Sequence, residues 1–289
     1  MEPVAPLVSI ISPSYNQDSF IEDMILSVKN QSYKNIEHII IDGGSSDNTL
    51  EIIKKYEKTY NLSWISEADK GQADAIGKGF DRINGTIVTW LNTDDYYLDE
   101  TAVEKVVKYF KEHDAIDIVT GRGYWVDEKK SIISAIVKNK KLITLKYMRY
   151  ADFILQPATF FRRSVIDSIK IEKQYSYVFD WLFFLTLFEK NFSFLVVDDF
   201  FSAYRIYKNN KTGQDNANRK EEIYEVALRN FGRLSFQTKY CYSIYRLYVI
   251  AEKLPKPLEK LFKYLINKIN YGIKILTDYR LCSGWERLK

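Results

Sequence analysis

Four short apolar segments alternate with three helical segments along the first hundred residues, and this alternation constrains the fold most. The apolar segments span residues 7–12, 36–41, 62–65 and 86–91, and the helical ones about 19–29, 48–60 and 71–83. Such an alternation with short connections is typical of βαβ units, which form a largely parallel sheet covered by helices. We therefore expect an α/β fold. Ser19 and Glu22 predict a capping box at the start of the first helix.

Polar or glycine-rich residues follow each of these four predicted strands. They are Tyr15-Asn16, Asp42, Asp69-Lys70-Gly71 and Asn92-Thr93-Asp94-Asp95. In an open α/β sheet, ligands bind in the crevice outside the carboxyl ends of the strands, so we expect these residues to face a ligand. Side chains of adjacent residues on an extended chain diverge, so one of Asp94 and Asp95 can hold a hard cation while the other bonds a hydroxyl. A solvated turn ahead of a helix near Asp99 is the alternative.

The glycine pair Gly43-Gly44, followed by a serine, suggests a cradle for a phosphate group. It lacks the spacing of a P-loop or of a dinucleotide-binding loop, so the signal is weak. An acidic strand edge also repels phosphates. If the ligand is a nucleotide, we expect a divalent cation to mediate its binding.

The formal net charge of +4 is unevenly distributed along the chain. Residues 219–289 contain 15 Lys and Arg against 7 Asp and Glu, so this region carries +8 and residues 1–218 carry −4. A nucleic-acid groove requires a positive stripe of its own. We therefore expect no nucleic-acid partner for the body of the protein.

The cysteine content indicates a reducing compartment. Cys241 and Cys282 lie far apart and outside any paired motif, so we expect neither a disulfide framework nor a zinc site. Residues 1–6 lack the regions of a secretory signal, and no segment reaches 18 uninterrupted apolar residues. We expect a cytoplasmic protein, either soluble or peripherally bound to the inner face of the membrane.

Four motifs, in order and in spacing, resemble those of glycosyltransferase family 2. They are VSIISPSYN at 8–16, IDGGSSDNT at 41–49, DKGQADA at 69–75 and NTDD at 92–95. The resemblance is close from residue 7 to about 115 and looser to about 215. It implies a GT-A fold with a Rossmann-like mixed sheet, a nucleotide-sugar donor, a Mn²⁺ or Mg²⁺ ion, and inversion at the anomeric carbon. We expect the donor to be UDP-linked.

The resemblance also assigns site residues by position. The donor site that it implies comprises Pro13, Tyr15, Asn16, Asp42, Asp69, Lys70, Gly71 and Asp94, with Arg205 and Lys211 from a later loop. Asp42 would accept a hydrogen bond from the imide of the base. Asp94 would approach the ribose, and Asp95 would bind the metal between the donor phosphates, with Asp94 as a second metal ligand.

The second half of the chain supplies a candidate base. Residues 117–126 and 131–137 predict a hairpin beside the acceptor, and residues 156–163 resemble the family segment that precedes the acceptor pocket. Asp180 opens a very apolar helix, where the family's general base stands. Apolar surroundings would raise its pKa toward the range that suits a base. The alternative is a helix cap; Asp198 and Asp199 are then the next candidates.

Residues 204–213 resemble the loop that closes over the donor pyrophosphate. Many family members carry a His where Tyr207 stands, which leaves Arg205, Lys208 and Lys211 to neutralise the leaving diphosphate. A solvated basic loop is the alternative.

We divide the chain into a catalytic domain, residues 1–215, and a helical basic extension, residues 216–289. Nucleotide-sugar binding is expected in about 7–115 and the acceptor side in about 116–215. In the extension, apolar residues recur at helical spacing between 258 and 276, with lysines mostly on other faces. Such a helix can pack on the catalytic domain, pair with a second copy, or lie on an anionic membrane.

The sequence thus predicts a metal-dependent, inverting glycosyltransferase that transfers a sugar to a glycan or lipid-linked glycan in bacterial surface-polysaccharide or glycolipid synthesis. A nucleotidyltransferase is one alternative, but that class usually has a glycine-rich, basic loop after the first strand, where this chain has PSYN. A non-catalytic sugar-nucleotide-binding module is the other. The presence of Asp94, Asp95 and Asp180 argues against it.

Overall fold

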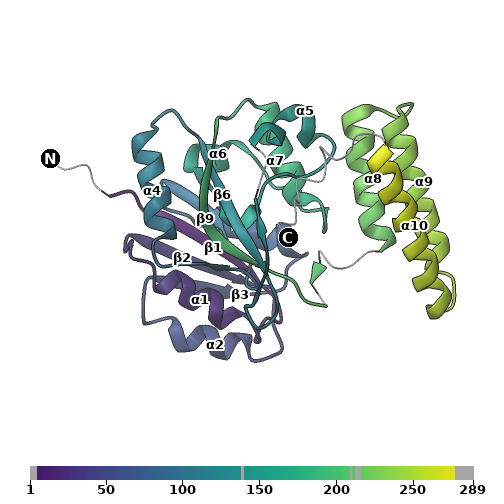
Figure 1. Cartoon of the computed structure of the whole chain (residues 1–289). Coiled ribbons are helices and arrows are strands. Elements are labelled where there is room, and N and C mark those ends of the chain that lie inside the picture. Colours follow the sequence, from purple (N-terminus) through teal and green to yellow (C-terminus); the bar gives the residue numbers. More distant parts are fainter. Residues whose placement is uncertain (1–4, 138–139, 209, 212–215, 277–289) are drawn as a thin grey trace.

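The computed structural model of the chain describes residues 5–137, 140–208, 210–211 and 216–276 (Figure 1). This part of the chain contains one nine-stranded sheet in the order β3-β2-β1-β4-β8-β6-β9-β5, with β7 paired to β6. The strands are β1 (Val8–Ser14), β2 (Ile36–Asp42), β3 (Leu62–Ser66), β4 (Ile87–Trp90), β5 (Tyr96–Tyr97), β6 (Ile118–Val126), β7 (Ile132–Ile136), β8 (Thr159–Arg162) and β9 (Phe194–Arg205).

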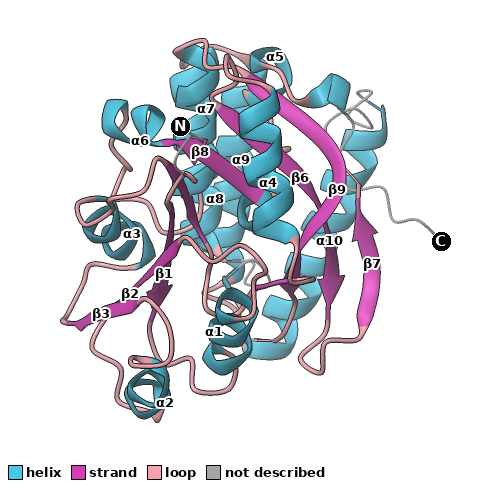
Figure 2. Ribbon diagram, turned by 90° about the vertical axis from the view of Figure 1, so that its left-hand side faces the viewer, coloured by secondary structure: helices cyan, strands magenta, loops and turns pink. Residues whose placement is uncertain are grey.

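The sheet is parallel in its first half and mixed in its second. β1 lies parallel to β2 and β4, and β2 lies parallel to β3, which confirms the predicted βαβ units. β8 is antiparallel to both β4 and β6. The predicted hairpin is present as β6 and β7. Figure 2 shows β9 as a long, curved strand beside β6, with which it pairs in parallel.

The helices follow the predicted segments, with shorter ends. They are α1 (Ile21–Lys29), α2 (Thr49–Tyr56), α3 (Gln72–Phe80), α4 (Ala102–Glu112), α5 (Leu145–Met148), α6 (Arg163–Ser168), α7 (Phe179–Glu189), α8 (Ala217–Phe231), α9 (Phe236–Ala251) and α10 (Lys256–Leu276). Two 3₁₀ turns, η1 (Lys140–Leu142) and η2 (Gln156–Ala158), complete the set. α2 stops before residue 60 because a turn from Tyr56 to Thr59 leads directly into β3.

The predicted capping box at α1 is wrong. Phe20 occupies the N-cap position, and no side chain caps this helix end. The carboxylate of Glu22 instead accepts hydrogen bonds from Lys55 and Tyr56 of α2, at 2.7 and 2.6 Å. The local pattern predicted that Glu22 would bond the backbone at the start of α1. In the structure it bonds the neighbouring helix α2 instead.

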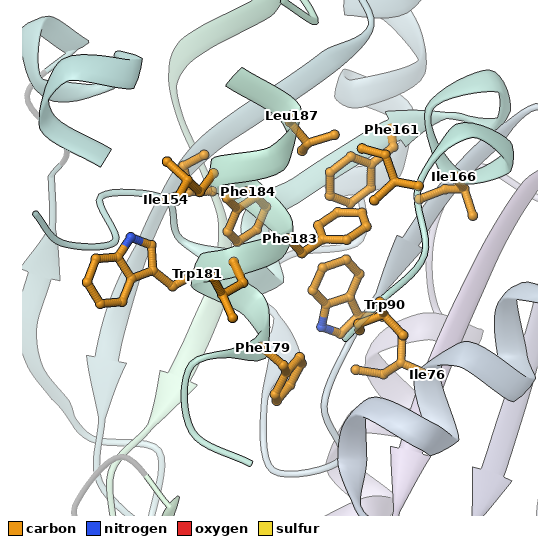
Figure 3. Packing of buried hydrophobic residues seen from close by; sticks show 14 of the residues in the cluster. Ile76, Trp90, Ile154, Phe161, Ile166, Phe179, Trp181, Phe183, Phe184 and Leu187 are labelled. Atoms are coloured by element: carbon orange, nitrogen blue, oxygen red, sulfur yellow. The ribbon is translucent and has the colours of Figure 1, made fainter. Parts of the chain in front are cut away.

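Two apolar clusters lie on the two faces of the sheet. One includes residues of α1, α2 and α4, and the other includes residues of α3, α6 and α7. In the second cluster, shown in Figure 3, the Trp90 ring stacks on Phe161 at a centroid distance of 5.6 Å and meets Phe183 edge-on at 5.3 Å. α7 is apolar on nearly all sides, as expected for a helix enclosed by the core. This packing fixes the start of α7 against the end of β4.

The three C-terminal helices form a bundle beside the sheet (Figure 1). α8 packs against the catalytic body, because Val226 belongs to the α7 cluster and Ile223 packs on it. A smaller cluster around Tyr248 and Ile266 joins α9 and α10. No described helix combines the length and the hydropathy that crossing a bilayer requires.

Candidate active site

A pocket of about 790 Å³ opens where the ends of β1 and β4 meet the start of α7 and the segment after β9. Seven of the predicted site residues line it: Pro13, Tyr15, Asp69, Gly71, Asp94, Asp180 and Lys211. Trp90 and Phe179, both labelled in Figure 3, also line the pocket. The polar strand ends thus meet at one pocket, and the individual roles remain predictions.

Asp42 does not point at solvent or at a ligand, contrary to expectation. Its side chain is fully buried and does not line the pocket. Oδ2 accepts hydrogen bonds from the backbone N–H groups of Gly44 and Ser45 and from the Ser66 hydroxyl, at 3.0, 2.9 and 2.7 Å. Oδ1 accepts from the Ser45 hydroxyl at 2.5 Å. These four bonds use the acceptor capacity of the carboxylate, so Asp42 organises the loop after β2.

Asn16 and Lys70 also lie outside the pocket lining. Asn16 adopts a left-handed backbone with φ of 50°, and its Oδ1 accepts from the backbone N–H of Ser46 at 2.8 Å. Its own N–H donates to the Ser45 hydroxyl at 2.8 Å. Asn16 therefore ties the loop after β1 to the loop after β2, and the donor contact predicted for it has no support in this geometry. Lys70 is exposed, and its backbone N–H donates to the Asp74 carboxylate at 3.2 Å.

Asp94 and Asp95 are not a solvated turn. Asp95 is 2% exposed, and the turn ahead of α4 is made by Asp99, which accepts a hydrogen bond from the backbone N–H of the N-cap residue Thr101 at 2.8 Å. Asp94 lines the pocket, whereas Asp95 lies behind it. Burial raises the pKa of Asp94, and burial together with the charge of Asp94 raises the pKa of Asp95 well above its usual range. A cation beside this half-buried and buried pair would favour their charged forms.

Arg205 is turned away from the pocket, so the prediction that it neutralises the leaving diphosphate is not supported. Its side chain is 1% exposed. The guanidinium donates to the Asp94 carbonyl, the Glu128 carbonyl and the Asp23 carboxylate, at 2.9, 3.0 and 2.9 Å. It also lies over the Phe20 ring, 4.4 Å from its centroid. Because these contacts hold the guanidinium on several sides, Arg205 fixes the loop that follows β9.

Four described residues of the 204–213 loop line the pocket: Tyr204, Tyr207, Asn210 and Lys211. The Tyr207 hydroxyl donates to Asp94 Oδ2 at 3.1 Å, so the residue that replaces the family His contacts the acidic pair. Partial burial lowers the pKa of Lys211, whose side chain still has exposed surface at the pocket. Lys208 is exposed outside the pocket lining.

Asp180 lies in the first turn of α7 and opens onto the pocket. Val178, not Asp180, occupies the N-cap position, so the alternative of a plain N-cap is wrong. Burial raises the pKa of Asp180, while the backbone N–H of Trp181, at 2.8 Å from Oδ1, and the charges of Arg219 and Lys211 act against this rise. Asp198 and Asp199, the next candidates for the base, do not line the pocket. Asp198 pairs with Arg122, and Asp199 accepts a hydrogen bond from the Tyr109 hydroxyl.

Several pocket residues were missed from the sequence. A chain of side-chain amides crosses the site: Gln72 donates to Asn92 at 2.7 Å, and Asn92 donates to Gln156 at 3.3 Å. The hydroxyl of Ser14 and the indole N–H of Trp90 are buried without a partner in the described structure, and both residues line the pocket. Buried polar atoms are nearly always bonded, to protein or to water, so both atoms can bond a ligand or an ordered water molecule.

The residues present fit a divalent metal ion with few protein ligands. No group of three or more His, Cys, Asp or Glu side chains suited to a metal occurs among the described residues. Magnesium-type ions bound with a nucleotide often use one or two carboxylates, with phosphate and water oxygens completing the shell. Asp94 at the pocket wall, with Asp95 beside it in the chain, offers this kind of donor set.

Comparison with known proteins identifies a family model. The model described as Glycosyl transferase family 2 matches residues 9–170. The poly(ribitol-phosphate) β-N-acetylglucosaminyltransferase TarP of Staphylococcus aureus is 30% identical over 240 residues, which cover 77% of this chain and 72% of TarP. The chain spans only 64% and 46% of the lengths of two other curated relatives.

Solved structures of low sequence identity share the fold. The solved chain of S. aureus TarS, residues 1–349 with UDP-GlcNAc, superposes with a TM-score of 0.63 at 17% identity, over 90% of this chain and 79% of that 1–349 chain. A mannosyltransferase of Pyrobaculum calidifontis, solved with GDP-Man and Mn²⁺, gives 0.62 at 15% identity, over 95% of this chain and 82% of that protein. These neighbours confirm the predicted α/β fold of GT-A type.

Proposed function

Because this chain belongs to glycosyltransferase family 2, we propose that it transfers a sugar from a UDP-linked donor to a hydroxyl group of a glycan or lipid-linked glycan, with inversion at the anomeric carbon. Family membership makes it a glycosyltransferase enzyme, so neither a nucleotidyltransferase nor a non-catalytic module remains a competing interpretation. The donor, the acceptor, the metal and the stereochemical outcome are parts of the proposal.

One observation supports this proposal above all others. The pocket is lined both by Asp94, a candidate metal ligand, and by Asp180, a carboxylate that can take a proton. A displacement that inverts a centre needs a base on one side of the reacting carbon and stabilisation of the leaving group on the other. Asp94 lies in the segment after β4, and Asp180 lies in the first turn of α7. The amides of Asn92 and Gln156 line the same pocket.

The chemistry then follows from the roles of the side chains. Asp180 accepts the proton of the acceptor hydroxyl as its oxygen bonds to the anomeric carbon and the bond to the diphosphate oxygen breaks. Its raised pKa makes it a stronger base than an exposed aspartate. Lys211, and Arg219 of α8, place positive charge in the same pocket. Tyr207 holds Asp94 by a hydrogen bond.

A divalent ion, Mn²⁺ or Mg²⁺, is part of this proposal. Asp94 and Asp95 would hold it, and it would neutralise charge on the diphosphate leaving group. The mannosyltransferase neighbour was solved with Mn²⁺, which supports the same requirement here.

Two relatives support a role in bacterial surface polymers. TarP is named for transfer of N-acetylglucosamine to poly(ribitol phosphate). Another relative, 31% identical over 130 residues, is named poly-β-1,6-N-acetyl-D-glucosamine synthase. TarS was solved with UDP-GlcNAc, which favours a UDP-linked donor. We propose a polyhydroxylated surface glycan or its lipid-linked precursor as acceptor, used on the cytoplasmic side of the membrane.

A panel of nucleotide sugars tests the proposal. Release of UDP or GDP from each donor is measured in the presence of Mn²⁺ with the wild-type protein and with Asp180→Asn. We expect turnover with one or more UDP-sugars and its loss in the variant. Binding of nucleotide sugars without turnover of any donor, in the presence of a cell-wall glycan fraction, would contradict the proposed function.

We further propose that α9 and α10 attach the protein to an anionic lipid surface. In α10 the apolar stripe faces outward: Leu258, Leu261, Leu265 and Ile269 are 44 to 62% exposed in the described structure. The inner face holds the buried Ile266, with Phe262 beside it, and the buried Glu259, which pairs with Lys263 at 3.0 Å. A large exposed apolar patch marks an interaction site.

The charge around this stripe favours lipid over a second copy. Residues 232–269 contain eight Lys and Arg and two Glu. Both glutamates, Glu252 and Glu259, already pair with Lys263. Two copies joined through this face would bring like charges together, which opposes association. An anionic membrane presents the opposite charge and accepts the apolar stripe.

A further inference from the structure

Glu222 of α8 binds the backbone just ahead of Asp180. Its Oε1 accepts a hydrogen bond from the N–H of Ser176 at 2.9 Å, and its Oε2 accepts from the N–H groups of Tyr177 and Val178 at 2.7 and 3.1 Å. Val178 is the N-cap residue of α7, and no side chain of that segment caps the helix. The carboxylate of Glu222 therefore supplies acceptors to the donors at this helix start.

The helix that carries Glu222 is itself held against the catalytic body. Asn216, at the start of α8, donates to the Tyr177 hydroxyl at 2.8 Å. Near its other end, Arg229 pairs with Glu172 at 2.6 Å and with Glu189 at 3.5 Å. Val226 is buried in the α7 cluster. α8 thus contacts α7 and the segment before it at several points, so the position of Glu222 is well defined.

α8 also reaches the pocket directly. Arg219, one turn before Glu222, lines the pocket, and its charge opposes the rise in the pKa of Asp180. The matched family model ends at residue 170, well before this helix. The domain boundary predicted at residue 215 separates α8 from the catalytic domain, although Arg219 of this helix lines the pocket.

We propose that Glu222 is a positioning residue for Asp180, and that α8 completes the active site rather than belonging to a separable extension. Hydrogen bonds to a charged acceptor are roughly twice as strong as neutral ones. Three of them fix residues 176–178, and this segment sets the direction in which the first turn of α7 enters the pocket. A shift of about 1 Å in a reacting group can lower a rate by about 100-fold.

The inference depends on the base role proposed for Asp180, so the experiment tests both. Glu222→Gln is compared with Glu221→Gln, which makes the same charge change on the same helix at an exposed residue that accepts from Tyr245. For each variant we measure kcat, donor KM, UDP affinity by calorimetry, thermal unfolding, and hydrogen exchange of the amides in residues 176–182.

We expect Glu222→Gln to lower kcat by about 10-fold or more, to leave UDP affinity within about 3-fold, and to speed amide exchange at residues 176–178. Glu221→Gln should behave like wild type. Combined with Asp180→Asn, Glu222→Gln should lower kcat no further, because one residue acts through the other.

Other outcomes separate the two proposals. Normal kcat and exchange in Glu222→Gln, with an inactive Asp180→Asn, would overturn the positioning role alone. Loss of kcat and of UDP affinity in parallel with a large drop in unfolding temperature would also overturn it, since Glu222 would then only stabilise the fold. Normal turnover in Asp180→Asn would overturn the base role and the positioning role that depends on it.

Discussion

The backbone N–H of Arg205 donates a 3.0 Å hydrogen bond to Oδ1 of Asp95, and the Arg205 side chain returns to the Asp94 carbonyl at 2.9 Å. The end of β9 and the acidic motif after β4 are thereby locked together. The same guanidinium reaches Asp23 of α1. One arginine thus connects three parts of the catalytic body behind the pocket, and it determines where Asp94 and Asp95 lie.

We predict that Arg205→Lys destabilises the protein. Lysine has no planar fork of donors, so it cannot serve the Asp94 carbonyl, the Glu128 carbonyl and Asp23 together. Buried acceptors left without donors cost about 1 to 3 kcal/mol each, so we expect a loss of about 3 kcal/mol in unfolding free energy by urea denaturation. Lys208→Gln, at an exposed loop residue, is the control. An unchanged midpoint with a selective loss of UDP affinity would restore Arg205 as a donor-binding residue.

We predict that UDP binding requires a divalent ion and depends on Asp94. Calorimetry with Mn²⁺ should show binding that a chelator removes, because the acidic pair repels a diphosphate. Asp94→Asn should reproduce the effect of the chelator without loss of stability, since burial already disfavours its charge. Asp99→Asn is the control, as this acid serves only the turn before α4 and Lys105. Equal UDP affinity with and without chelator would contradict the metal proposal.

We predict that Asp42→Ala loses stability first and nucleotide affinity second. The substitution leaves two backbone N–H groups and two hydroxyls without their acceptor. We expect a loss of about 2 to 4 kcal/mol in the free energy of unfolding, measured by urea denaturation. Asp42→Asn should lose less, because an amide oxygen retains part of the acceptor set. A stable Asp42→Ala protein with weak UDP binding would return Asp42 to the donor site.

These residues show which parts of the site local sequence predicts. The alternating pattern predicted that β1, β2, β3 and β4 lie parallel, and hence that their ends meet at one edge of the sheet. Asp180 was recognisable as an acid at the start of an apolar helix. Asp42 was misplaced because a carboxylate before a tight turn can bond its own loop as readily as a ligand. Whether Asp42 bonds the protein or a ligand depends in part on Ser66, which lies 24 residues further along the chain.

The contribution of α8 had no local signal at all. Its helical period indicates only that one face is covered, and an extension of this composition is compatible with packing, pairing or membrane attachment. Glu222 reaches Ser176 across 46 residues of chain. Contacts of this range are set by how elements dock, and docking is not encoded in the pattern of any one helix.

We predict salt-sensitive attachment to anionic vesicles. Vesicles with phosphatidylglycerol should sediment the full-length protein at low salt and release it at high salt, since Lys and Arg near an anionic surface contribute about 1 kcal/mol each. The double variant Leu261→Ser/Leu265→Ser should bind weakly. Ile133→Ser removes a similarly exposed apolar side chain, 55% exposed like Leu261, from β7 and serves as control. No sedimentation at low salt, with a dimer in solution, would favour a second copy as the partner.

Asp180→Asn is predicted to abolish transfer without harming the fold. The pKa of Asp180 is raised by burial, so the folded protein binds its proton more tightly than the unfolded chain does. At pH values above the folded-state pKa the ionised carboxylate therefore lowers stability, and this penalty disappears as the pH falls. Asn never ionises, still offers an oxygen to the Trp181 N–H, and leaves the N-cap at Val178 unchanged. The variant should unfold at the same temperature as wild type, or higher, near neutral pH.

The same raised pKa gives the wild-type enzyme a defined pH dependence. A general base must be ionised, so kcat should fall as the pH drops through the pKa of Asp180. Burial raises this pKa above the ordinary aspartate value of 3.8, although the charges of Arg219 and Lys211 lower it in part. Loss of a general base lowers a rate by about 10²- to 10⁴-fold, which is the fall in kcat that we expect for Asp180→Asn. The UDP affinity of this variant should be unchanged, because other residues bind the diphosphate of the donor. Turnover and UDP affinity measured on one folded preparation of Asp180→Asn separate these effects. Near-normal turnover, with the acidic limb of kcat intact, would assign that limb to another group and remove Asp180 from the chemistry.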